Sequence, residues 1–140
     1  MSTAPESAPG FEKHPDYRVD ITASDRHVRV LAGDCVIADT RNALAVQESK
    51  HHPVWYLPLA DVNTDLLTAT ETSTYCPFKG HASYWSIHTP QEELTDAVWS
   101  YQSPYSECLA LQDYVGFYTD KVVMEIDGER EGTDGPGRSD

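Results

Sequence analysis

The chain has few basic residues, with ten lysines and arginines against 23 aspartates and glutamates and a formal net charge of −13. Because nucleic-acid binding depends on cationic side chains that neutralise phosphates, this balance argues against DNA or RNA as a partner. No segment approaches the roughly 20 consecutive apolar residues of a membrane span, and the first 17 residues lack the basic and apolar regions of a signal peptide. We therefore expect a cytoplasmic protein with no membrane partner.

Cysteine is scarce, and the common catalytic motifs are missing. Cys35, Cys76 and Cys108 are odd in number and widely spaced, which predicts free thiols rather than a disulfide framework. The chain contains no CxxC, GxGxxG, P-loop, GxSxG or HExxH pattern. The adjacent His51 and His52 would point to opposite faces of an extended strand. The sequence thus predicts no metal and no cofactor.

The 140 residues, of which 39% are hydrophobic, fit one domain with a single core. Residues 1–16 are rich in Pro, Ser, Gly and Glu, and residues 128–140 are polar without an apolar pattern. Both segments are predicted to be disordered tails. The folded domain is therefore expected to comprise residues 17–127.

Within that domain the apolar residues fall in short runs separated by turn residues, without the 3.6-residue spacing of a long helix. This pattern predicts a mainly β fold of antiparallel strands with one or two short helical turns, one of them within residues 61–67. The Ala-Gly-Asp of positions 32–34 is expected to close a hairpin. The predicted strands cover residues 27–31, 35–38, 43–48, 54–57, 83–87, 97–101 and 114–118, the last extended by 122–126.

A carboxylate stands among apolar residues in the segment from 43 to 48. The two-residue period of a strand places Leu44, Val46 and Glu48 on one face, which is expected to point into the core. A buried charge generally needs a partner, and Lys79 is the candidate. The pair could hold the sheets in register, orient the polar groups of a ligand, or not form.

The segment TYCPFKGHASY, from Thr74 to Tyr84, gathers a thiol, an ammonium, a proline and a glycine at an expected loop. Lys79 could favour a thiolate at Cys76, which would make Cys76 a nucleophile or redox thiol. The alternative is that Cys76 is a buried small hydrophobe, the commoner role of a single cysteine in a β protein.

Aromatic residues lie in or beside the predicted strands, and most are expected to be core. Tyrosine and tryptophan also carry a polar atom, so several of them near a carboxylate and an ammonium are typical of a small-molecule pocket. The predicted ligand-binding residues are Tyr56, Thr74, Tyr84, Trp99 and Tyr101.

Four segments in a fixed order carry a resemblance to a known family: RVLAGDCVIADT, PVWYLPLADV, TYCPFKGHASYW, and AVWSYQSPY with YVGFY. Together they resemble the uncharacterised domain-of-unknown-function 427 family over roughly residues 25–120. The resemblance implies a β-tent of small curved antiparallel sheets, similar to the zinc-binding Mss-four-like group. The paired CxxC motifs that hold zinc in that group are absent here, so no metal is carried over. The family's motif positions fall on Glu48, Tyr56, Pro58, Asp61, Thr74, Cys76, Lys79, Gly80, Tyr84, Trp99 and Tyr101.

The family brings no activity, so three functional hypotheses stand. The first is a small-molecule binding domain in which Glu48 and Lys79 orient a polar or zwitterionic ligand beside the aromatic residues. The second is an enzyme in which Cys76 attacks or is oxidised, Lys79 stabilises the thiolate or an oxyanion, and Glu48 moves protons. The third is a structural or interaction domain using open sheet edges. The oligomeric state is open, with a homodimer among the possibilities.

Overall fold

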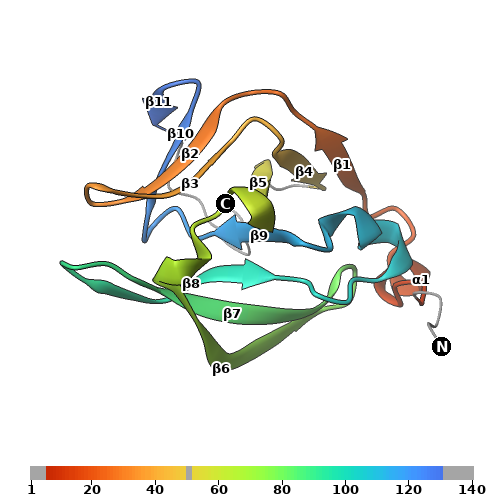
Figure 1. Ribbon diagram of the computed structural model, residues 1–140. Coiled ribbons are helices and arrows are strands. Elements are labelled where there is room, and N and C mark those ends of the chain that lie inside the picture. Colours follow the sequence, from red (N-terminus) through yellow and green to blue (C-terminus); the bar gives the residue numbers. More distant parts are fainter. Residues whose placement is uncertain (1–5, 50–51, 131–140) are drawn as a thin grey trace.

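The computed structural model describes residues 6–49 and 52–130, which form two antiparallel sheets (Figure 1). The first sheet has seven strands in the order β1-β4-β5-β9-β8-β7-β6, and the second has four in the order β11-β10-β2-β3. The expectation of a mainly β fold is confirmed. The strands are β1 Val19–Ala23, β2 Val28–Ala32, β3 Cys35–Thr40, β4 Leu44–Glu48, β5 Val54–Pro58, β6 Leu67–Cys76, β7 Gly80–His88, β8 Glu93–Ser100, β9 Tyr114–Phe117, β10 Val123–Ile126 and β11 Glu129–Arg130.

Helical structure among the described residues is limited to short pieces. One α-helical turn, α1, covers Gly10–Lys13, and three 3-10 helices follow: η1 Leu59–Asp61, η2 Thr64–Leu66 and η3 Ser106–Leu111. The helical turn expected within residues 61–67 corresponds to the end of η1 and to η2. The finer expectation of a tent topology stays a prediction.

The β2–β3 hairpin forms where the sequence predicts it. Ala32 pairs with Cys35, and Gly33 takes the positive φ of +59° that closes the turn. Strand β6, by contrast, was not among the predicted strands, and its last residues, from Thr74, were expected in a loop entering a strand. Its sequence LTATETSTYC is mostly exposed at the edge of the seven-stranded sheet, so it lacks the apolar alternation that marks half-buried strands. Its threonines nonetheless suit extended backbone.

One hydrophobic core lies where the two sheets face each other. Val28 and Val30 of β2 are fully buried there, together with Leu57, Val98 and Val115 of the seven-stranded sheet. Two-residue alternation places the intervening residues of β2 on the opposite, outer face. The four-stranded sheet thus has one apolar and one charged face.

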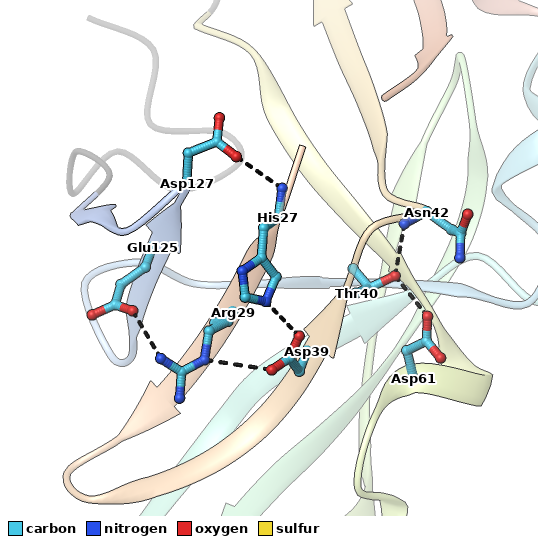
Figure 2. Close-up of polar contacts among 8 residues, drawn as sticks. All are labelled: His27, Arg29, Asp39, Thr40, Asn42, Asp61, Glu125 and Asp127. Atoms are coloured by element: carbon cyan, nitrogen blue, oxygen red, sulfur yellow. Dashed lines mark hydrogen bonds and ion pairs between the residues drawn. The ribbon is translucent and has the colours of Figure 1, made fainter. Parts of the chain in front are cut away.

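Figure 2 shows the charged face and its ion pairs. The Arg29 guanidinium lies 3.4 Å from Glu125 and 3.5 Å from Asp39, while His27 Nε2 lies 2.7 Å from Asp39. These side chains are at least three-tenths exposed, so each pair contributes little to stability. We interpret this face as a solvated surface.

A second core covers the other face of the seven-stranded sheet. Alternation along the paired strands brings large side chains together above Gly116, where an added Cβ would lie 2.2 Å from the Trp99 ring. The absence of a side chain at this position is what allows the indole to lie flat against β9. The buried members of this core are Val46, Tyr56, Ala82, Tyr84, Trp99, Tyr101, Cys108 and Leu111.

Residues 6–16 of the predicted tail 1–16 lie within the described residues. Ala8 is buried, and the segment packs through α1 against the turn between β6 and β7. At the other end, Glu129 and Arg130, which fall in the predicted tail 128–140, pair with β10. The remaining parts of both predicted tails, residues 1–5 and 131–140, lie outside the described residues. Among those that are described, no helix is long and apolar enough to cross a membrane.

Candidate functional site

The turn from Cys76 to Gly80, here called the Lys79 turn, joins β6 to β7. The Lys79 amide donates a hydrogen bond to the Cys76 carbonyl (3.2 Å), and Gly80 adopts a φ of +120°. The segment before η3 closes the turn from outside, because the Tyr105 amide donates to the Lys79 carbonyl (3.0 Å). This conformation directs Lys79 into the protein, where only 6% of its side chain is exposed.

Glu48 and Lys79 form the predicted ion pair. The Lys79 ammonium donates to Glu48 Oε1, and the Tyr17 hydroxyl donates to Glu48 Oε2. The Glu48 side chain is 18% exposed, so the carboxylate is mostly shielded from water. Burial, followed by this hydrogen bond and the nearby negative charge of Glu48, raises the pKa of Tyr17. Tyr17 therefore stays a neutral donor at physiological pH.

The segment from residue 6 to residue 17 covers the Lys79 turn. The Phe78 ring stacks on Tyr17 at a centroid distance of 4.0 Å and meets Phe11 edge-on at 5.0 Å. The Gly10 amide donates to the Pro77 carbonyl (3.0 Å), and a Cβ at Gly10 would overlap the Phe78 ring. The ion pair is thus enclosed by residues distant in sequence.

The three cysteines have different surroundings. Cys76 is partly buried against the second core, whereas Cys35 packs against the first. Cys108, in η3, is fully buried and donates from its thiol to the Phe78 carbonyl (3.5 Å). Burial raises the pKa of Cys108 to about 11. Only Cys76 combines partial exposure with a place beside the Lys79 turn.

Behind the turn, aromatic residues continue across the sheet face. The Trp99 indole N–H donates to the Tyr56 hydroxyl (3.1 Å), and the two rings meet nearly at right angles. Tyr56 and Trp99 are only 2% and 1% exposed, and Tyr101 is also buried. Burial is the main cause of the raised pKa values of Tyr56 and Tyr101. These three predicted ligand contacts are core residues in the structure.

Farther along the same face lies a pocket of about 360 Å³, here called the tyrosine pocket. This volume is in the range that accommodates small ligands. The pocket lies between strands β6 to β8 and the tight turn after β9. Its lining residues are Thr72, Thr74, Tyr84, Asp96, Tyr118, Asp120 and Lys121.

A chain of hydroxyl groups runs along the tyrosine pocket. The Tyr84 hydroxyl hydrogen-bonds to the hydroxyls of Thr74 (3.0 Å) and Tyr118 (3.3 Å). The two tyrosine rings lie within 12° of parallel, with centroids 6.4 Å apart, and Trp99 packs behind Tyr118 at 4.8 Å. The pocket wall therefore combines aromatic surface with groups that can both donate and accept hydrogen bonds.

Two irregularities of the sheet place a carboxylate at the pocket. The register between β6 and β7 shifts between Ala69 and Ser73, and the register between β7 and β8 shifts near Asp96. Asp96 itself has a φ of +51°. The hydroxyls of Thr70 and Thr72 donate to the Asp96 carboxylate at 2.7 and 2.6 Å. These hydrogen bonds, that from Thr72 first, lower the pKa of Asp96. Bulges that redirect a side chain in this way recur near binding and active sites.

The structure divides the predicted site residues into three groups, of which the core residues Tyr56, Trp99 and Tyr101 are one. Glu48, Lys79 and Cys76 lie at or beside the Lys79 turn, while Thr74 and Tyr84 line the tyrosine pocket. Sequence reasoning did not single out Tyr17, the first residue of the predicted domain, or Asp96. Tyr118 could have been found, because it shares the face of Gly116 at a spacing of two residues.

Comparison with protein-family models matches residues 20–128 to the family described as a domain of unknown function (DUF427). The chain belongs to this family. The match covers strands β2 to β10, all but the first residue of β1, and all residues predicted for the site, so the Lys79 turn and the tyrosine pocket lie within the DUF427 domain. No match was found among curated proteins. Within residues 6–49 and 52–130 of this DUF427 domain, no group of three or more His, Cys, Asp or Glu side chains is arranged to hold a metal ion.

Proposed function

We propose that this DUF427 domain binds a small molecule in the tyrosine pocket. The observation that carries the proposal is the pocket of about 360 Å³ in which predicted ligand residues Thr74 and Tyr84 meet Tyr118 through hydrogen-bonded hydroxyls. Concave sites with aromatic walls and a few fixed polar groups are the usual places for small ligands. Trp99 supports Tyr118 from behind, so the wall is preorganised rather than assembled from mobile side chains.

The Glu48–Lys79 pair has a different role in this proposal. Both oxygens of Glu48 accept hydrogen bonds, one from Lys79 and one from Tyr17. A carboxylate and an ammonium that satisfy each other in this way hold the Lys79 turn against β4. The pair thus supports the sheet face that carries the pocket.

Benzyl alcohol, a neutral aromatic probe, tests the proposal by nuclear magnetic resonance. Titration should shift the backbone amide signals of Thr74, Tyr84 and Tyr118 in a saturable manner. The variant Tyr118→Leu should weaken this response, whereas Tyr75→Leu should not, because Tyr75 is an exposed tyrosine of β6 outside the pocket lining. Shifts that fail to saturate, or that are equal in both variants, would overturn the proposal.

A second candidate function is thiol chemistry at Cys76, favoured by its partial exposure beside the Lys79 turn. Iodoacetamide alkylation of a Cys35→Ser/Cys108→Ala variant across pH tests it. The ordinary pKa of a free thiol is about 8.5. An alkylation rate that levels off well below this pH would support a reactive Cys76. A rate that follows an ordinary thiol would remove this candidate and leave the tyrosine pocket.

A further inference from the structure

The charged side chains at the tyrosine pocket favour a ligand with a positive charge. Asp96 and Asp120 contribute two carboxylates, whereas Lys121 contributes one ammonium. That ammonium donates a hydrogen bond to the Thr95 carbonyl at 2.5 Å, so a backbone oxygen holds it at the rim. The pocket wall therefore carries a net negative charge.

The Asp96 carboxylate is held in place by uncharged groups. The hydroxyls of Thr70 and Thr72 donate to it, while the Lys121 ammonium acts on it more weakly through its charge. An ionised carboxylate has about four acceptor positions, so two hydroxyl donors leave capacity for a further donor. Hydrogen bonds to the charged form also keep it ionised. A fixed carboxylate of this kind suits a ligand ammonium group.

The aromatic wall matches the same ligand chemistry. The nearly parallel rings of Tyr84 and Tyr118 stand beside the carboxylates, and the negative face of a tyrosine ring attracts cations. Burial, followed by the hydrogen bond with Tyr84, raises the pKa of Tyr118. The Tyr118 phenol therefore remains neutral and can accept a hydrogen bond from an N–H group.

We propose that the ligand of the tyrosine pocket is a compact organic cation, an amine with an apolar body, whose ammonium lies at Asp96 and whose body lies against Tyr84 and Tyr118. This inference rests on the proposed function and adds the ligand class to it. The net charge of −13 supplies a long-range attraction for cations as well.

Three probes of similar shape and different charge test the ligand class: benzylamine as the cation, benzyl alcohol as the neutral form and benzoate as the anion. Nuclear magnetic resonance titration at fixed ionic strength should give affinities in the order benzylamine, benzyl alcohol, benzoate. We expect benzylamine to bind about fivefold more tightly than benzyl alcohol, from one exposed ion pair and one cation–π contact. Equal affinities for the amine and the alcohol would overturn the cation class and leave the proposed function standing.

Charge variants locate the effect. Asp96→Asn should weaken benzylamine binding about fivefold and benzyl alcohol binding by a clearly smaller factor, and asparagine tolerates the positive φ at this position. Lys121→Gln should strengthen benzylamine binding. Asp20→Asn, an equal charge change on exposed β1, should leave both affinities unchanged. An equal effect of Asp20→Asn and Asp96→Asn would assign the preference to net charge and overturn the inference. Failure of all three probes to shift the pocket signals would overturn the proposed function itself.

Discussion

Removal of the Lys79 ammonium should destabilise the protein strongly. In Lys79→Met, which keeps the length of the side chain, the Glu48 carboxylate loses one of its two hydrogen bonds and the ammonium with which it is paired. Breaking a buried pair typically costs about 3–5 kcal/mol, because one charge is left without compensation. Since Glu48 retains 18% exposure, we expect the lower end, about 3 kcal/mol, or a decrease in Tm of roughly 10 °C.

Urea unfolding followed by tryptophan fluorescence measures this loss, and a double-mutant cycle isolates the pair. Glu48→Gln should cost a similar amount, while Glu48→Gln/Lys79→Met should cost at least about 2 kcal/mol less than the sum, because no buried charge remains unpaired. Arg26→Gln is the surface control, since its ion pair with Asp127 is about half exposed and should contribute less than about 1 kcal/mol. Single-variant costs below about 1 kcal/mol that simply add would refute a buried, structural pair.

Three further predictions concern the neighbours of this pair. Tyr17→Phe removes the second hydrogen bond to Glu48 and should lower the free energy of unfolding by about 1 kcal/mol in urea titrations. An unchanged free energy of unfolding would contradict the packing of residues 6–17 over the Lys79 turn. Gly116→Ala places a Cβ 2.2 Å from the Trp99 ring and should lower the free energy of unfolding by about 1–3 kcal/mol and alter the tryptophan fluorescence. Unchanged stability and fluorescence would contradict the close packing. Burial raises the pKa of Cys108 from 9.0 to about 11, so with rising pH the thiol ionises first in the unfolded state. The free energy of unfolding in urea should therefore fall as pH rises from about 9 to 11, and this fall should be smaller in Cys108→Ala.

The sequence predicts best what depends on local alternation. Leu44, Val46 and Glu48 share a face because successive strand residues point to opposite sides, so a carboxylate in that row had to meet a buried partner. The hairpin at Gly33 follows from equally local turn chemistry. Such features need no knowledge of which strands are neighbours.

Features that depend on distant contacts were missed. Tyr17 precedes the first predicted strand, and its hydrogen bond to Glu48 spans 31 residues. Asp96, just before the predicted strand 97–101, was not singled out, because neither its positive φ nor the two bulges that bring Thr70 and Thr72 to it leave a pattern in the sequence. The order of strands in a sheet decides which distant residues come into contact, and that order depends on the whole chain.

The two carboxylates of this sheet face illustrate why a charged residue in a core is not automatically a binding residue. Glu48 is paired with an ammonium that is itself buried, so the field of each charge is largely cancelled where it stands. Asp96 is held by neutral hydroxyls instead, and the cation that acts on it, Lys121, is exposed. Its negative charge is therefore fixed in direction and less fully cancelled than that of Glu48, beside a pocket that a ligand can enter. A site selects a charged ligand only if some of its own charge is left for that ligand. By this criterion Asp96, rather than the more deeply buried Glu48–Lys79 pair, is the residue on which ligand recognition by this domain should depend.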